Sequence, residues 1–520
     1  MLLKSVLICV SFCIQFSLQS EPSENHYWAG VVEYTHKETL SNTTKVSPHN
    51  RTLDNLEKYK EVIRSAEAYP VDIMVFPEGA LNTIDTAVFV PNPEDSIFPC
   101  NDLDYEGIVQ ELSCLARSRR KYLVINLIEK ATCLDPGNPR SCSTDDSYRF
   151  NTNVVFDRKG IVIARYRKIN LISEYDIDKT VEPELVKFHT DFGVTFGTFI
   201  CFDLMFYTPA LQLVRQNVTD FVFPTMWSCQ LTFWSAFYIQ RDWAYENNVN
   251  LLVAGANHPR TSTTGSGMYA GKRGRIVATM SHIAGIKLFV TKVPKIGAQE
   301  GDVIRQPIND DIAEEMTDHD LNRNQVDGYA TMGLPLSSND RYSAKLCHNE
   351  LCCSFTLNYT VDLPTDPDAQ HYRYRLVVYD GNRTLVGENA DVIITTCGIL
   401  ACSEDRFSTC GIRHFNASSV ENVVQFNSIE VIGDFPEGEG IFLVPSSTDT
   451  SNLPLELDEF DYSHQKSDSH NFVQYYLTSP RSELLSFAIR GRKFVYSNTG
   501  TSWTAGILGI LAGIFTALSM

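Results

Sequence analysis

The sequence predicts a layered α/β domain followed by a smaller β-rich module. Up to about residue 300, short apolar segments alternate with segments whose apolar residues recur at helical spacing. Beyond about residue 345 the alternation is that of strands, and six cysteines gather between Cys347 and Cys410. Because 520 residues are too many for one ordinary hydrophobic core, two domains are expected.

The first domain is expected to open with a helix, because Leu53, Leu56, Ile63 and Ala66 recur at helical spacing. Strands and helices then alternate, which is the pattern of a layered α/β fold. In chain order, the expected elements are strands at 71–76 and 122–127 with a helix around 108–115 between them, a hairpin of 152–156 and 161–166, a strand entering Cys201, strands at 220–223, 250–255 and 287–293, and a helix over 233–247.

The second module is set apart by a polar, acidic segment at 301–345, which is expected to connect the two domains. The α/β domain then spans 21–300 and the β-rich module spans 346–496. Within the module, alternating apolar residues predict strands at 354–361, 372–379, 391–396, 441–444 and 484–495.

Both ends of the chain resemble processing signals. Residues 1–20 have the pattern of a secretory signal peptide, with Lys4 ahead of an apolar run, so the mature chain is expected to begin near Glu21. Residues 497–520 place small residues before an uncharged apolar tail, which is typical of a glycosylphosphatidylinositol (GPI) signal. Ser497 or Asn498 is the expected attachment point, which would hold the protein on the extracellular face of the plasma membrane.

A short transmembrane helix is the alternative for this tail, with Gly509 and Gly513 on one face. The apolar run from Ala505 to Met520 is shorter than the roughly 20 residues that a spanning helix needs. Passage through the secretory pathway also fits six glycosylation sequons, which lie at Asn42, Asn50, Asn217, Asn358, Asn382 and Asn416.

The cysteine count constrains which thiols can pair. Of 14 cysteines, Cys9 and Cys13 leave with the signal peptide, and the other twelve meet an oxidising compartment where pairing is the default. If Cys201 stays free, eleven remain, so at least one more is unpaired or joins another chain. Cys229 is the candidate, because Trp227 and Leu231 beside it suggest a buried position.

The net charge of −19 argues against nucleic acid or an anionic membrane surface as a partner. The charge indicates nothing more specific. The expected partners are a small-molecule amide substrate, which the candidate site residues imply, and the membrane through the lipid anchor. The sequence makes no prediction of oligomeric state.

Three residues at predicted strand ends suggest amide hydrolysis. Cys201 follows an apolar strand as a nucleophile would on a tight turn, Glu78 ends 76–78, and Lys168 ends 165–168. A thiol attack on an amide needs a base and a stabiliser for the oxyanion. Glu78 could take the thiol proton and return it to the leaving amine. Lys168 could favour the thiolate and face the oxyanion, which the backbone N–H of Phe202 would also bind.

Each of the three also has a structural interpretation. Cys201 could be a paired or buried structural cysteine, Glu78 a solvated loop residue and Lys168 part of an exposed basic edge. Their parallel placement at three strand ends favours the catalytic interpretation.

Around these residues the sequence resembles the carbon–nitrogen hydrolases of the nitrilase superfamily, and within them the secreted branch of vanins (pantetheinases) and biotinidase. Glu78, Lys168 and Cys201 are similar to that superfamily's Glu-Lys-Cys triad. The resemblance covers most of residues 25–290 and continues more weakly into 347–353, which resembles the branch's accessory base domain. The segments that carry it are 151–156, 164–168, 199–203, 223–227, 249–254 and 264–267.

The resemblance implies an αββα sandwich and a covalent thioester intermediate that water releases. It also implies that Glu174 orients Lys168, and that the reaction needs neither a metal nor a cofactor. Cys347, Cys352 and Cys353 with His348 could suggest zinc, yet disulfides are the favoured interpretation in a secreted chain.

The chain departs from the branch where substrate would bind. Ile172 stands at a usually aromatic position, Ser228 and Cys229 replace a usual Met-Asn pair, and Thr232 replaces a proline. Trp227 and Cys229 are therefore the candidates for the substrate pocket. The expected reaction is hydrolysis of pantetheine to pantothenate and cysteamine. Biotin amides such as biocytin are the second candidate, and a catalytically silent surface protein for adhesion or ligand binding is the third.

Overall fold

The computed structural model of the protein describes residues 19–35, 46–105, 107–133, 147–297, 321–323, 326–366, 368–384, 391–411, 413, 420–436 and 440–494. The expected signal peptide up to residue 18, residues 301–320 and 324–325 of the acidic connection, and the whole predicted anchor signal lie outside these ranges. Contacts divide the chain into two units, one of residues 1–324 and 450–454 and the other of 325–449 and 455–520.

The first unit contains two six-stranded sheets. The first sheet consists, in spatial order, of β13 (Ile286–Pro294), β1 (His26–Tyr34), β2 (Ile73–Val75), β3 (Tyr122–Thr132), β4 (Ser147–Phe156) and β5 (Val162–Arg167). The second consists of β12 (Arg275–Thr279), β11 (Ser266–Ala270), β10 (Asn250–Gly255), β8 (Asp220–Thr225), β7 (Thr195–Thr198) and β6 (Lys187–His189).

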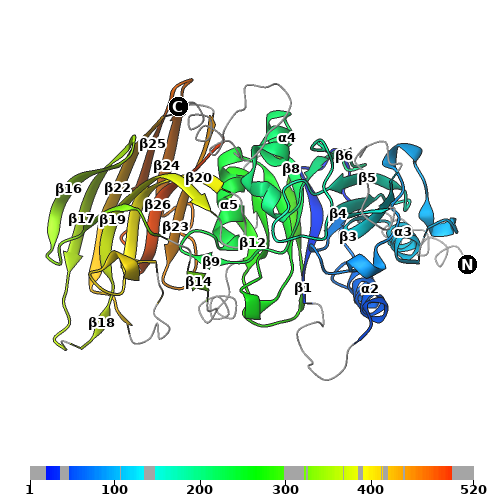
Figure 1. The fold of residues 1–520 in the computed structure, drawn as a ribbon, viewed down its shortest axis with the longest axis horizontal. Helices are drawn as coiled ribbons and strands as arrows, with labels where there is room; N and C mark the ends of the chain where they lie inside the picture. The colour runs from blue at the N-terminus through cyan, green and yellow to red at the C-terminus, as the bar shows by residue number, and fades with distance from the viewer. Residues whose placement is uncertain are drawn as a thin grey trace, which may run out of the picture. The chain divides into compact units, whose positions relative to one another are not determined.

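Helices cover the outer faces of the two sheets, which completes four layers (Figure 1). Helices α2 (Pro48–Arg64) and α3 (Gly107–Arg119) lie on the first sheet, and α4 (Gln212–Arg215) and α5 (Ala236–Asn247) lie on the second. The αββα sandwich that the resemblance implied is confirmed. The predicted strand at 250–255 coincides with β10, and the predicted helix at 233–247 begins three residues late, as α5.

Alternation of side chains along the buried strands gives each sheet two apolar faces. Val31, Val75 and Val124 point towards Val222 and Leu252 of the second sheet and fill the space between the sheets. Their neighbours point the other way and pack on α2 and α3, as Val32, Met74, Phe76, Leu123 and Ile125 do. The strands are therefore apolar on both faces, and the sites where polar side chains interrupt them stand out.

The second unit is built mainly from two five-stranded sheets. One consists of β15 (Ala330–Gly333), β19 (Arg373–Thr384), β20 (Asp391–Cys402), β26 (Leu484–Lys493) and β23 (Ile441–Asp449), and the other of β16 (Asn339–His348), β17 (Leu351–Val361), β22 (Val424–Pro436), β25 (His470–Leu477) and β24 (Phe460–Lys466). Since β15 and most of β16 precede residue 346, this unit takes in part of the segment that the sequence suggested was a connection.

Disulfides hold this unit as the cysteine cluster predicted. Cys347 pairs with Cys352 across a hairpin, Cys402 pairs with Cys410, and the bond between Cys353 and Cys397 joins the two sheets. The cysteines that could have suggested zinc are thus disulfide-bonded. No metal-binding group of acidic, histidine and cysteine side chains occurs among the residues the structure describes.

Candidate active site

The predicted site residues lie at the carboxyl ends of strands from both sheets of the first unit. Glu78 follows β2, which runs parallel to β1 and β3, and Lys168 directly follows β5. Cys201 follows β7, which runs parallel to β8. Parallel strands bring their carboxyl ends to one edge, where polar side chains can meet without interrupting the apolar core.

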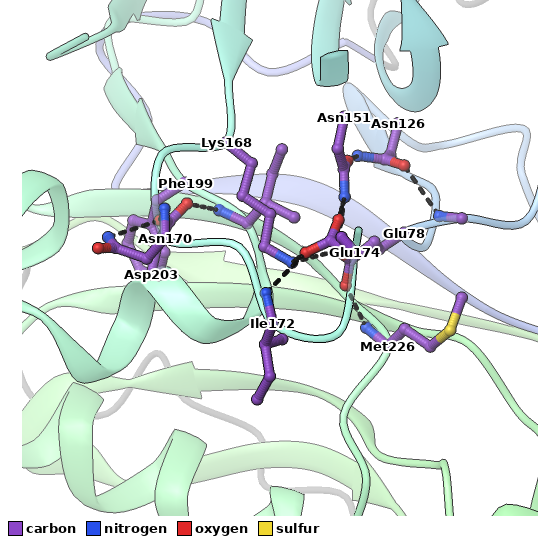
Figure 2. Close-up of polar contacts among 12 residues, drawn as sticks. Glu78, Asn126, Asn151, Lys168, Asn170, Ile172, Glu174, Phe199, Asp203 and Met226 are labelled. Carbon is purple, nitrogen blue, oxygen red and sulfur yellow. Dashed lines mark hydrogen bonds and ion pairs between the residues drawn. The ribbon is translucent and has the colours of Figure 1, made fainter. Parts of the chain in front are cut away.

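Lys168 lies between two carboxylates (Figure 2). Its Nζ is 2.7 Å from Glu78 Oε1 and 2.5 Å from Glu174 Oε2, and the Lys168 side chain is 1% exposed. The Ile172 N–H also donates to Glu174 Oε2, at 3.1 Å. Glu174, which the resemblance suggested as the residue that orients the lysine, is thus in direct contact with it.

The charges around Lys168 decide its protonation. Burial alone would lower the pKa of Lys168, but the Glu78 and Glu174 carboxylates outweigh burial and raise it well above its usual range. Lys168 is therefore a permanent ammonium, suited to stabilising an anion that forms beside it.

Glu78 is held on both of its oxygens. Oε1 accepts from Lys168, and Oε2 accepts from the backbone N–H of Met226, at 2.8 Å, just beyond β8. The next residue, Gly79, has φ +64°, and a Cβ there would lie 2.5 Å from Met226 Cε. The left-handed backbone therefore favours glycine beside Glu78, and any side chain there would also displace the end of Met226.

Cys201 has the backbone of a nucleophile elbow. Its φ is +46°, a left-handed conformation that is uncommon for a residue with a side chain and that clusters at functional sites. It begins a short 3-10 turn over Cys201–Met205, directly after the extended Ile200. Within the described part of the chain the N–H of Phe202 meets no hydrogen-bond acceptor, so it is available as the predicted oxyanion donor.

Burial raises the pKa of the Cys201 thiol well above its usual range, and the Glu78 carboxylate raises it further. Lys168, the Thr225 hydroxyl and the Met226 N–H oppose this shift without reversing it. The sequence predicts that Lys168 favours a thiolate at Cys201. Burial and Glu78 together raise the pKa of this thiol by more than Lys168 lowers it. The thiol is protonated at rest, and its proton must leave as the sulfur attacks.

Similarity to known proteins follows the same division into two parts. The sequence profile of the family described as "Carbon-nitrogen hydrolase" matches residues 46–286, and that described as "Vanin C-terminal domain" matches residues 319–497. The chain is 37% identical to "Vanin-like protein 1" of Drosophila melanogaster over 95% of this chain and 90% of that protein. The chain belongs to the vanin-like carbon–nitrogen hydrolases.

Two mammalian relatives carry names that state an activity. The chain is 30% identical to "Pantetheinase" of Homo sapiens, over 70% of each protein, and 30% identical to "Biotinidase" of Mus musculus, over 76% of this chain and 82% of that one. This vanin-like protein is accordingly a hydrolase of amide carbon–nitrogen bonds.

Asp203 joins the two halves of the vanin-like site. Its Oδ2 accepts from the Ile200 N–H at 3.0 Å and from the Tyr166 hydroxyl at 2.7 Å. Its Oδ1 accepts from the backbone N–H of Asn170 at 3.0 Å and from the Asn170 side chain at 2.8 Å. The turn that carries Cys201 is thereby tied to the loop that follows Lys168.

The Asp203 carboxylate is fully buried, and burial raises its pKa to about 6 although its hydrogen-bond donors lower it. Asp203 was not among the site residues predicted from the sequence. Its signal was an acidic residue two positions after the elbow in an otherwise apolar segment.

The two candidates for the substrate pocket lie together on the segment after β8. The Trp227 indole N–H donates to the Trp234 carbonyl at 2.7 Å, and the two rings stack with centroids 5.8 Å apart. The Cys229 sulfur accepts from the Ala236 N–H at the start of α5, and burial raises the pKa of this thiol to about 12. The function of both residues in substrate binding stays a prediction.

The prediction that Cys201 and Cys229 are unpaired is confirmed, since both are free and buried. Cys100 and Cys114 form a disulfide in the first unit, and Cys133 is also disulfide-bonded. Such bonds persist in an oxidising compartment.

Proposed function

We propose that this vanin-like protein hydrolyses pantetheine to pantothenate and cysteamine with Glu78, Lys168 and Cys201. The observation that carries the proposal is the buried contact of Lys168 Nζ with Glu78 Oε1 next to a protonated thiol on a strained elbow. A carboxylate base, a fixed cation and a nucleophile are the groups that acyl transfer through sulfur requires.

In the first half of the reaction the Cys201 sulfur attacks the amide carbonyl carbon as Glu78 takes the thiol proton. The oxyanion of the tetrahedral intermediate is stabilised by the Lys168 ammonium and the Phe202 N–H. Glu78 then gives its proton to the departing nitrogen, the carbon–nitrogen bond breaks, and cysteamine leaves. The acyl group remains on Cys201 as a thioester.

Water completes the cycle. Glu78 takes a proton from the water as its oxygen attacks the thioester carbonyl, and the second tetrahedral intermediate uses the same cation and N–H. The carbon–sulfur bond then breaks, Glu78 returns the proton to the sulfur, and the acid leaves. One amide and one water thus become one acid and one amine.

Biotin amides are the alternative substrates, because one relative is named biotinidase and Ile172, Ser228 and Cys229 depart from the vanin pattern. The purified protein should be incubated with pantetheine and with biocytin, and the release of cysteamine and of lysine followed by mass spectrometry. We expect cysteamine release at least tenfold faster than lysine release.

The Cys201→Ala variant is the matched control and should release neither amine. Faster release of lysine would assign the protein to biotin amides. Release of neither amine by the unmodified protein would contradict both substrates and favour a surface protein that only binds.

We also propose that the protein is secreted, glycosylated and held on the cell surface by a GPI anchor at Ser497 or Asn498. Disulfides in both units support an oxidising compartment. Of the six sequons, the described Asn50, Asn217 and Asn382 are exposed and Asn358 is half-buried, while Asn42 and Asn416 lie outside the described residues. No helix in the described ranges is both long enough and apolar enough to cross a membrane.

Phosphatidylinositol-specific phospholipase C should release the protein from the surface of intact cells into the medium, as followed by immunoblot. A chain that stops after residue 496 should appear in the medium without the enzyme. Retention of the full chain after phospholipase treatment would favour the short transmembrane helix instead.

A further inference from the structure

One asparagine contacts both carboxylates that bind Lys168. Asn151 lies on β4, and its side-chain Nδ2 donates to Glu78 Oε1 at 2.8 Å and to Glu174 Oε1 at 2.6 Å (Figure 2). Its backbone carbonyl accepts from the Lys168 N–H at 2.9 Å. We infer that Asn151 is a positioning residue that holds Glu78 ready to take the thiol proton, an inference that rests on the proposed roles of Glu78 and Cys201.

The orientation of the Asn151 amide is fixed by a second buried asparagine. Asn126 Nδ2 donates to Asn151 Oδ1 at 2.7 Å, so the Asn151 oxygen is occupied and its NH2 group must face the carboxylates. Asn126 Oδ1 accepts in turn from the Gly79 N–H at 2.9 Å, next to Glu78. Asn126 is fully buried and Asn151 is 4% exposed, so water does not compete for these bonds.

This arrangement distinguishes the two oxygens of Glu78. Lys168 and Asn151 both bind Oε1, which leaves Oε2 beside the Met226 N–H. The same N–H lowers the pKa of the Cys201 thiol as a hydrogen-bond donor, so Glu78 Oε2 and the sulfur share one donor. Oε2 is therefore the atom that takes the proton, while Asn151 keeps Oε1 from turning towards it.

Asn151 also separates like charges. Glu78 and Glu174 share one ammonium, and two carboxylates this close repel each other unless a donor lies between them. The Asn151 NH2 group is that donor, and it adds no charge of its own. Without it, either carboxylate could rotate about Lys168 and take Oε2 away from the thiol.

The test compares two variants of Asn151 with a control that has similar burial and a similar number of hydrogen bonds. Asn151→Ala removes the amide, and Asn151→Asp keeps its shape but replaces the donor with an acceptor. Asn250→Ala is the control, because Asn250 is fully buried on β10 and its Nδ2 donates to Asp220 Oδ1 at 2.7 Å and to the Pro294 carbonyl at 2.8 Å.

Three readouts separate positioning from folding. Tm measures stability, kcat and KM for amide hydrolysis measure function, and the rate at which iodoacetamide alkylates Cys201 measures proton removal from the thiol. In alkylation the sulfur–carbon bond forms, the carbon–iodine bond breaks to release iodide, and the thiol proton passes to Glu78. Mass spectrometry of the Cys201 peptide gives this rate without any substrate.

We expect Asn151→Ala to lower kcat by about 10²-fold, the scale of general base catalysis, with KM within about threefold. Asn151→Asp should lower kcat at least as much, and alkylation of Cys201 should be slower in both Asn151 variants than in the unmodified protein. Asn250→Ala should lower Tm as much as Asn151→Ala and leave both rates within about twofold.

Equal kcat and alkylation rates in Asn151→Ala and Asn250→Ala would overturn the inference. If the unmodified protein cleaves neither pantetheine nor biocytin, the proposed substrates are wrong. The alkylation rates would still decide whether Asn151 positions Glu78.

Discussion

Cys201→Ala will abolish turnover and leave the protein folded. Loss of the sulfur removes the atom that forms the thioester, and kcat should fall by about 10⁶-fold, the scale seen when a covalent nucleophile is lost. Alanine is smaller than cysteine and tolerates the φ of +46° no worse, so Tm should fall by no more than about 4 °C. Steady-state kinetics and thermal unfolding on the same preparation check both parts.

The second free thiol provides the control. Cys229→Ala keeps Cys201, so rapid quenching with substrate should still give an acyl adduct on the Cys201 peptide, whereas Cys201→Ala should give none. An adduct on any other residue, or turnover by Cys201→Ala within tenfold of the unmodified protein, would show that Cys201 is not the nucleophile.

Lys168→Met will reduce both stability and activity. It leaves the buried Glu78 carboxylate and the partly buried Glu174 carboxylate without their shared cation, and leaving the buried Glu78 charge unpaired in this way costs about 3–5 kcal/mol. It also removes the ammonium that faces the oxyanion, which should lower kcat by a further factor of about 10²–10³ or more. Urea unfolding gives the free energy, and kcat is measured on the fraction that remains folded.

A second substitution separates the two effects. Adding Glu174→Gln to Lys168→Met removes one of the two uncompensated charges, so the double variant should be more stable than the single one and equally inactive. If Lys168→Met unfolds at the same urea concentration as the unmodified protein, the ion pairs of Lys168 with Glu78 and Glu174 do not stabilise the fold.

Strand ends could be predicted from the sequence because apolar runs stop where polar residues begin. That pattern predicted Glu78, Lys168 and Cys201 as site residues although they are far apart in the chain. The structure places Glu78 and Lys168 in contact. The resemblance to a family added Glu174, which no pattern in the residues around it suggested.

Other features of the site depend on contacts that spacing does not reveal. Asn151 reaches Glu78 across 73 residues, and nothing in the sequence sets it apart from the other polar side chains of β4, such as Arg149, Thr152 and Asn153. The protonated state of Cys201 could not be predicted either. It depends on how deeply the thiol is buried and on which charge is nearer, and both follow from the packing of two sheets.

The division of the site between the two sheets determines when during folding the protein can become active. Glu78 and Lys168 come from one sheet, whereas Cys201 and the N–H of Met226 come from the other. Neither half can cleave an amide until the sheets have stacked. An incompletely folded chain, in which the two sheets have not yet stacked, would therefore be inert. Activity per molecule therefore reports how much of a preparation has finished folding.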